Sequence, residues 1–460
     1  MAVTPGPDVG TDLSSPLIMN RRTFITAGSA SLGALTLGST AAVADSTGRF
    51  VVDRTSLRTE SDLEIVHELE PVDLLVVRAT ADRLDRSGAA YAPDRQLAVD
   101  RYRPTAVAGL ESSAPARDLT DFQWDKRDQG VPEAHEITRG EGTRVAIIDS
   151  GIAADHPDLD GQVDLDLSRN FAPDEYGVGE PYGGTHGTHV AGIVAATDDG
   201  SGVVGSAPGA DLVDLRVFGA ALESRDRGDL PPAYWRETYM GDVMAAIVYA
   251  AEIGCDVANL SLGWTWEMRM DGWGKFWGTV HQRVGRYARR QGMVHTHASG
   301  NWGESLQFNR DETDSSETAG GLTTSATGPV GFDPETGTYD EPPHSPSTYT
   351  THGVGAIDLA APGGKGGEFT HDNVLNAIAL PQFDDDGTYL GADYGHAWFA
   401  GTSMAAPQVA GAAALVASAN PRYNANQVAN ALTRTAEIPE EYDRKYYGRG
   451  YLDTLAAVRD

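Results

Sequence analysis

Residues 144–149 read RVAIID, four apolar side chains in a row followed by a carboxylate. A short continuous apolar run of this kind is typical of a strand buried on both faces of a parallel sheet. Similar runs occur at 211–218, 256–263 and 293–299, and helical patterns alternate with them at 187–197, 240–254, 276–291, 405–419 and 424–436. This alternation predicts an α/β fold with three layers, a parallel sheet between two layers of helices.

The composition favours a folded protein with an anionic surface. The chain has 460 residues, 40% of them hydrophobic, and a formal net charge of −31. A surface of that sign excludes nucleic acid as a partner, because phosphates need a basic surface. Only four of the 35 basic residues are lysines, and acidic residues are spread along the whole chain. We therefore expect a halophilic protein, since high salt screens charge repulsion to within a few ångströms.

One cysteine, Cys255, excludes an intrachain disulfide. It lies in EIGCDVANLSLG, where a small buried hydrophobic residue is needed, so we expect a core residue and not a nucleophile.

The first 45 residues have the features of an export signal. Paired arginines, Arg21 and Arg22, precede a weakly apolar stretch that ends in Ala42-Val43-Ala44, a small-residue cleavage pattern. Twin arginines mark the export route for folded proteins, and the apolar stretch is too short and polar to span a membrane. We expect residues 1–44 to be a twin-arginine signal peptide and the mature protein to be secreted, without a membrane anchor.

Residues 46–112 predict a small α+β unit. Strand-like runs RFVVD, LEIVHELE, VDLLVVRAT and RQLAVDRY accompany one short helix candidate, ADRLDRSGAA. Residues 106–121 are rich in Ala, Ser and Pro and indicate a linker, after which the α/β pattern begins. Within the larger unit we expect surface loops at 219–239, 264–275 and 303–346.

Asp149 and two histidines are the first candidate functional residues. Asp149 ends its strand at the carboxyl edge of the sheet, where sites form in α/β folds, although a solvated strand end would look the same. His186 and His189 lie three residues apart at a helix start, in GGTHGTHVAG. Helical zinc pairs are usually spaced by four with a glutamate between. The pattern therefore favours a functional His186 in a cleft and a packed structural His189, with a zinc hydrolase as an alternative.

Ser403 lies in FAGTSMAAPQVAG, where the chain turns into a helix. Exposed N–H groups and the positive end of the helix dipole gather there, so developing negative charge is favoured. An isolated serine at this point is more often only a helix cap. Small neighbours such as Gly401 and Ala405 leave space for a substrate beside the hydroxyl.

Six segments together resemble the subtilisin-like serine proteases of the subtilase family, of the halolysin-like type secreted by salt-loving microbes. They are VAIIDSGIAADHPDL, HGTHVAGIVAA, VANLSLG, ASGNWG, IDLAAPGG and GTSMAAPQVAGAAAL, in the family's order. The resemblance implies that Asp149 orients His186, that His186 is the general base, and that Ser403 attacks the peptide carbonyl.

The resemblance also implies groups that bind substrate. Asn301 would donate to the oxyanion together with the Ser403 N–H. Ser261, Leu262 and Gly263 would form an edge that pairs with an extended substrate. The sequence departs from the family directly afterwards, because Trp264 and Trp266 follow where another glycine is common. They would either narrow a side-chain pocket or pack under an inserted loop.

A structural Ca²⁺ is implied by the same resemblance. Asp158, nine residues after Asp149, would join a loop in ATDDGSGVV, with Asp199 as the second carboxylate. Carbonyl oxygens would complete the set of oxygen ligands that calcium prefers. The predicted ligands are Asp158, Thr197, Asp199, Ser201 and Val203. An acidic surface loop is the alternative.

The resulting prediction is a secreted serine endopeptidase made as a zymogen. Residues 1–44 would be the signal, 45–115 an inhibitory propeptide, and 116–460 the peptidase domain. Its partners would be protein or peptide substrates and its own propeptide as an intramolecular inhibitor, and we expect a monomer. The alternatives are a catalytically inactive peptide-binding module on the same fold and, for the N-terminal unit, a permanent binding domain.

Overall fold

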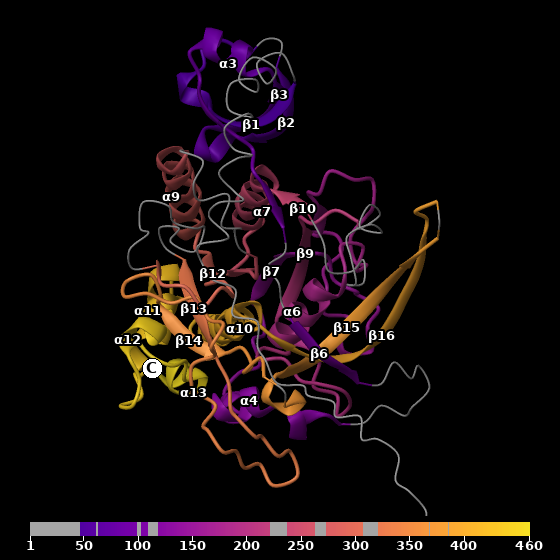
Figure 1. Cartoon of the computed structure of the whole chain (residues 1–460), viewed down its shortest axis with the longest axis vertical. Helices are drawn as coiled ribbons and strands as arrows, with labels where there is room; N and C mark the ends of the chain where they lie inside the picture. Colours follow the sequence, from indigo (N-terminus) through magenta and orange to yellow (C-terminus); the bar gives the residue numbers. More distant parts are fainter. Residues whose placement is uncertain are drawn as a thin grey trace, which may run out of the picture.

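A parallel sheet forms the centre of the molecule (Figure 1). The computed structural model of the chain describes residues 47–60, 63–98, 103–108, 118–220, 237–262, 273–306, 321–367, 369–384 and 386–460. In these residues seven strands pair in the order β14-β13-β12-β11-β7-β9-β8. Their bounds are β7 Arg144–Asp149, β8 Arg169–Asn170, β9 Asp211–Arg216, β11 Val257–Leu260, β12 Val294–Ala298, β13 Leu322–Thr327 and β14 Leu359–Pro362.

Helices cover both faces of this sheet, as the continuous apolar strands predict. Val145 and Ile147 of β7 face one core, while Ala146 and Ile148 face another. The first core contains α6 Thr185–Ala195, α10 Thr402–Ala419, α11 Ala425–Thr435 and α13 Thr454–Arg459. The second contains α7 Met240–Glu252 and α9 Gly274–Arg290. The three-layer α/β prediction is therefore confirmed.

The N-terminal unit is a small α+β domain that lies against α7 and α9 (Figure 1). Its antiparallel sheet has the order β2-β3-β1-β4. One face packs on α3 in a separate small core, and the other joins the core of α7. The elements are β1 Gly48–Asp53, β2 Glu64–Leu69, β3 Leu74–Ala79, α3 Ala81–Ser87 and β4 Ala90–Pro93.

Two smaller sheets join the N-terminal part of the chain to the large domain. Strand β5 Gln96–Ala98 pairs with β10 Glu237–Tyr239, which leads into α7. Strand β6 Arg103–Ala108 pairs with β16 Tyr389–Ala400, which forms a long hairpin with β15 Val374–Phe383. The remaining helices are α4 Trp124–Asp128, α5 Val131–Ala134, α12 Arg444–Tyr447, and 3-10 turns at Arg54–Ser56, Glu70–Val72, Thr120–Phe122, Pro157–Leu159 and Thr370–Asp372.

Some expected loops are strands in the structure. The prediction of a loop over 303–346 is wrong at β13, whose six residues LTTSAT are all buried in the sheet. Likewise β10 forms the end of the expected loop at 219–239. The sequence did not indicate a strand at β13, because a run rich in Thr and Ser lacks the apolar pattern of a buried strand. Among the described residues, no helix is long and apolar enough to cross a membrane.

Candidate active site

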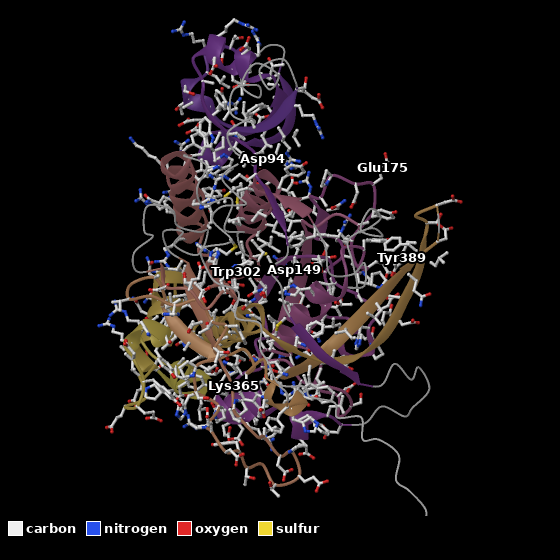
Figure 2. The ribbon with its side chains drawn as sticks, in the orientation of Figure 1. Asp94, Asp149, Glu175, Trp302, Lys365 and Tyr389 are labelled. Carbon is white, nitrogen blue, oxygen red and sulfur yellow. The ribbon has the colours of Figure 1, made fainter. Side chains whose placement is uncertain are left out.

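Asp149 and His186 form a hydrogen-bonded pair at the carboxyl edge of the sheet (Figure 2 labels Asp149). His186 Nδ1 lies 2.8 Å from Asp149 Oδ1 and 3.0 Å from Oδ2. Both side chains are buried, and Asp149 Oδ1 also accepts from the Ser150 N–H at 2.7 Å. A carboxylate in this position places the proton on Nδ1, so the other ring nitrogen, Nε2, is the basic one.

Close packing of backbone segments brings these two residues together. A Cβ at Gly187 would lie 2.4 Å from the carbonyl oxygen of Gly151, so only glycine lets the start of α6 approach the end of β7 this closely. The Gly187 N–H donates to Ser150 Oγ at 2.9 Å, and Ala153 N–H donates to Thr188 Oγ1 at 3.1 Å. Ser150 thus holds the turn after Asp149 against the first turn of α6.

Ser403 lies in the first turn of α10, an 18-residue helix, and is 3% exposed. Its hydroxyl donates to the carbonyl oxygen of Ser261 at 3.3 Å, and Ser261 Oγ donates to the carbonyl oxygen of Ser403 at 2.7 Å. These reciprocal bonds fix the serine relative to the end of β11. The N-terminal position on a long helix supplies N–H groups and the positive dipole end.

Asn301 is held beside the same turn. Its Oδ1 accepts from the Thr402 N–H at 2.8 Å and from Thr402 Oγ1 at 3.1 Å, while Thr402 Oγ1 accepts from the Gly300 N–H at 3.0 Å. With the oxygen facing Thr402, the amide nitrogen is the opposite end of the group. An ideal Cβ on Gly401 would lie 3.4 Å from Asn301 Nδ2, so this amide nitrogen lies beside the backbone two residues before Ser403.

The predicted substrate edge is described only in part. Ser261 and Leu262 are buried at the end of β11, whereas Gly263, Trp264 and Trp266 lie outside the described residues. Asn259 Nδ2 donates to Ser261 Oγ at 2.9 Å and its Oδ1 accepts from Thr296 at 3.0 Å. A chain of hydrogen bonds therefore runs from β12 through β11 to the backbone of Ser403.

Four of the predicted calcium ligands lie in the loop at 197–203, and the fifth, Asp158, contacts this loop. Asp158 Oδ2 accepts from the Val203 N–H at 3.0 Å and from His396 Nε2 at 2.7 Å, and Asp199 Oδ1 accepts from the Ser201 N–H at 2.9 Å. A Cβ on Gly202 would lie 2.2 Å from Asp158 Oδ1, so the carboxylate fits against this loop only because of the glycine.

Some of the groups at this loop could bind a cation, but one carboxylate, Asp158, already has a histidine partner. Burial raises the pKa of Asp158, but the His396 bond and charge and the Val203 N–H outweigh it and hold the pKa below its usual value. In the described residues, no hydrogen bond reaches the carbonyl oxygens of Thr197, Ser201 or Val203. Among those residues there is also no group of three or more His, Cys, Asp or Glu side chains suited to a metal. The loop thus offers carbonyls and two carboxylates, with His396 as a competitor for one of them.

His189 and Cys255 are core residues, as the sequence predicts. The His189 ring is fully buried, stacks on Phe399 at 4.3 Å, and its Nε2 lies 3.1 Å from the Ala397 carbonyl oxygen. Burial lowers the pKa of His189 to about 3. His186 and His189 therefore have separate partners, which argues against a zinc site built from both. Burial raises the pKa of the Cys255 thiol to about 12.

The three-layer α/β fold and these side chains define a serine hydrolase of the subtilisin type, with an aspartate, a histidine and a serine in the chain order Asp–His–Ser. The chain belongs to the Subtilase family, whose model matches residues 140–452. Members of this family are serine endopeptidases, and this protein is accordingly an enzyme that hydrolyses peptide bonds in peptide substrates.

Curated relatives agree with this family. The alkaline protease of Alkalihalobacillus alcalophilus is 28% identical over 403 residues, 87% of this chain and 83% of that protein. An intracellular serine protease of Paenibacillus polymyxa is 32% identical over 316 residues, 68% of this chain and 75% of the relative. The crystal structure of fervidolysin from Fervidobacterium pennivorans has a TM-score of 0.64 at 22% identity, covering 90% of this chain and 61% of that one.

Sequence reasoning missed several residues that position the site. Ser150, Thr402 and Asn259 hold Asp149, Asn301 and Ser261 in place. Each is a polar residue inside an otherwise apolar or small-residue motif, and each is buried. Such residues need hydrogen-bond partners, and that requirement is the signal that could have identified them.

Proposed function

We propose that this protein is a secreted serine endopeptidase of the halolysin-like type that acts through an acyl-enzyme. The observation that carries the proposal is the buried Asp149–His186 pair at the sheet edge where α10 presents Ser403. In the first step Ser403 Oγ attacks the carbonyl carbon of the scissile bond, and its proton passes to His186 Nε2. The resulting imidazolium is stabilised by the carboxylate of Asp149.

The second half of the cycle uses the same groups. His186 donates its proton to the leaving amine as the C–N bond breaks, which leaves an ester on Ser403. A water then attacks that ester with His186 as base, and the acid product leaves. Asn301 Nδ2 and the Ser403 N–H would donate to the oxyanion of each tetrahedral intermediate. Loss of one such donor costs about 3–4 kcal/mol of barrier.

The N-terminal domain is proposed to be an inhibitory propeptide. Its sheet is packed on α7, and Arg49 reaches across to Asp242 in α7 while also pairing with Asp94. Residues 1–44, which lie outside the described residues, are proposed to be a twin-arginine export signal. The anionic composition supports a habitat of high salt.

A structural calcium ion is proposed at the loop of Asp158 and Asp199, with the carbonyls of Thr197, Ser201 and Val203. Bound calcium would supply a rigid crosslink between this loop and the segment after Asp149. We expect the melting temperature of the purified enzyme to rise with added calcium and fall with chelator. Asp158→Asn should abolish this difference, whereas Asp333→Asn in an exposed turn should keep it; an equal response of both variants contradicts the assignment.

The central experiment compares Ser403→Ala with the parent. The parent should lose its N-terminal domain, hydrolyse casein in molar salt and react with a serine-directed phosphonate. The variant should stay uncleaved and unlabelled while keeping the far-UV circular dichroism of the precursor. A parent that folds but neither reacts nor cleaves would instead be an inactive peptide-binding module, and digestion by the variant would refute the mechanism.

A further inference from the structure

Strand β9 carries two charged side chains on the face of the sheet that α6 covers. Positions 212, 214 and 216 share one face of the strand, and Leu212 lies in the core that contains α6. The other two positions are Asp214 and Arg216, and both side chains are fully buried. Arg216 lies opposite Asp149 in the parallel ladder with β7. Because buried charges are costly unless they are paired and hydrogen-bonded, these two residues need partners beyond the sheet.

Arg216 uses all five N–H groups of its guanidinium. Two of them bind the carboxylate of Asp174, with Nη1 at 2.9 Å from Oδ2 and Nη2 donating to Oδ1. The remaining three donate to carbonyl oxygens, those of Tyr176 at 3.1 Å, Gly177 at 3.2 Å and Phe218 at 2.9 Å. A planar fork of five donors fits this arrangement, whereas a lysine offers three donors on one atom. The arginine therefore fixes a stretch of the chain between β8 and α6 to the carboxyl end of β9.

The fixed stretch packs against the turn that follows β7. The Gly179 N–H donates to Asp214 Oδ2 at 2.9 Å, and the Gly179 carbonyl oxygen accepts from the Ala154 N–H at 2.9 Å. A Cβ on Gly151 would lie 2.6 Å from the carbonyl oxygen of Glu180, so only glycine lets the two pieces of backbone approach this closely. Contacts therefore run without a gap from β9 through this stretch to the turn at the end of β7.

The same stretch leads directly into α6. The Gly184 N–H donates to the carbonyl oxygen of Pro181 at 2.7 Å, and the Gly184 carbonyl oxygen accepts from Ser150 Oγ at 3.2 Å. A Cβ on Gly183 would lie 2.1 Å from the carbonyl oxygen of Ser150. His186 is the second residue of α6. The position of its ring thus depends on how this stretch lies on the turn after β7.

We propose that Arg216 is a positioning residue for the reaction: by holding residues 174–177 it fixes the stretch before α6 and keeps His186 within hydrogen-bond distance of Asp149. The inference rests on the serine protease proposed above, in which His186 is the base. Arg216 acts through the backbone that leads from Gly177 to the start of α6. Since a misplacement of about 1 Å at a catalytic group can cost about 100-fold in rate, this clamp affects the rate as well as the stability.

Arg216→Lys keeps the charge and loses the fork. We expect kcat, measured per active site titrated with a serine-directed phosphonate, to fall about 30- to 100-fold. KM should change by less than about threefold, because the edge at Ser261 is untouched. Leu215→Ala is the matched control, since Leu215 is equally buried on the same strand and faces the core of α7. It should lower the melting temperature at least as much and leave kcat within about twofold of the parent.

A second measurement does not depend on activity. In the uncleaved Ser403→Ala precursor, the proton between His186 Nδ1 and Asp149 should give a ¹H NMR signal far downfield, because its hydrogen bond is charge-assisted. Adding Arg216→Lys should shift this signal upfield or broaden it through exchange with water. Adding Leu215→Ala should leave it in place.

Asp174→Asn tests the clamp from the other side and decides the question if the arginine variant does not fold. It weakens the hold on the same stretch and should change kcat and the downfield signal in the same direction. A parental kcat and signal in these variants, or an equal loss of kcat in Leu215→Ala, overturns the proposal and leaves the protease intact. A parent that does not react with the phosphonate and a precursor without the downfield signal overturn the proposed function and this inference together.

Discussion

Helices α6 and α10 cover one face of the central sheet, and helices α7 and α9 cover the other, but the two pairs are held differently. Lys126 Nζ joins the first pair from inside the large domain, donating to Ile193 O at 2.8 Å and Gln408 Oε1 at 2.7 Å. The second pair contacts the N-terminal domain, with Arg49 and His67 both on Asp242. The helices that carry His186 and Ser403 are therefore joined to each other from within the large domain, while helix α7 on the opposite face also contacts the N-terminal domain.

The largest expected effect concerns the catalytic face. Asp149→Asn should lower kcat by about 10⁴-fold, because the amide cannot hold the proton on His186 Nδ1 or stabilise the imidazolium. The melting temperature should stay close to that of the parent, since the amide fits the same space. Steady-state hydrolysis of a peptide substrate and thermal unfolding measure the two quantities. A loss of activity matched by a loss of fold would contradict a catalytic role.

Lys126→Met tests whether the buried amine holds α6 and α10 together. Removing the ammonium leaves Asp125 buried without its cation and leaves the Ile193 carbonyl without a donor. Breaking a buried pair in this way should lower the free energy of unfolding by about 4 kcal/mol. Lys445→Met at the surface should change it by less than about 0.5 kcal/mol. Chemical denaturation of both variants on the Ser403→Ala background provides the comparison.

The same lysine predicts a dependence on pH. Burial lowers the pKa of Lys126 from 10.5 to about 8. Between pH 8 and 10.5 the unfolded chain then binds more protons than the folded one at this residue, so its contribution to stability rises with pH in that window. The rise should be absent in Lys126→Met and present in Lys445→Met.

Asp242→Asn tests the other face. In the uncleaved Ser403→Ala precursor it leaves Arg49 with only Asp94 and should reduce stability by about 3 kcal/mol. In the proposed mature enzyme, which would lack the N-terminal domain, the same change should matter by less than about 0.5 kcal/mol. Equal losses in the two forms would show that the carboxylate acts within the large domain and would remove the contrast between the faces.

The last expected effect is a dependence of stability on acid pH that comes from two buried histidines on β12. His295 Nδ1 lies 2.7 Å from His297 Nε2, and Arg289 and His281 face this pair from α9. Burial lowers the pKa of His295 to about 4 and that of His297 well below 6.5. The unfolded chain therefore takes up protons below pH 6.5 that the folded chain refuses. Stability falls from pH 6.5 toward 4, by about 1.4 kcal/mol per pH unit for each group.

The double variant His295→Leu, His297→Leu checks this slope. Replacing both partners of a buried hydrogen bond by apolar groups is nearly neutral near pH 7. Melting temperatures measured from pH 7 to pH 5 should then decline less steeply than in the parent. His344→Leu, at a partly exposed position, should keep the parental slope. An unchanged slope in the double variant would refute the histidines as its source.

The fold was predictable from sequence where single strands carry their own signal. Strand β7 matches the predicted 144–149 at both ends, because charged residues bound an apolar run that is buried on both faces. Strand β13 was not predictable, because its Thr and Ser side chains are buried with distant hydrogen-bond partners; Ser325 Oγ, for example, donates to the carbonyl oxygen of Tyr446. That bond joins residues that are far apart in the sequence, and a short sequence pattern cannot reveal such a contact.

The candidate site, too, could be predicted from the sequence only in part. Asp149, His186 and Ser403 lie in long motifs, and the first two meet in the structure at hydrogen-bond distance. The bonds of Ser150 with Asp149, of Thr402 with Asn301 and of Ser261 with Ser403 depend on separate segments meeting at one sheet edge. The calcium ligands stay a prediction, since His396 approaches Asp158 from a hairpin that the local sequence around Asp158 does not reveal.

The reactivity of Cys255 can report how often the core beneath α7 opens. It is the single thiol of the chain, it is buried in the core beneath α7, and burial raises its pKa to about 12. A thiol reagent needs the thiolate, so it modifies the native protein only through openings that expose this core. The rate of a single colour-forming reaction then reports how often the α7 face opens, and it can be compared with and without the N-terminal domain without any engineered label.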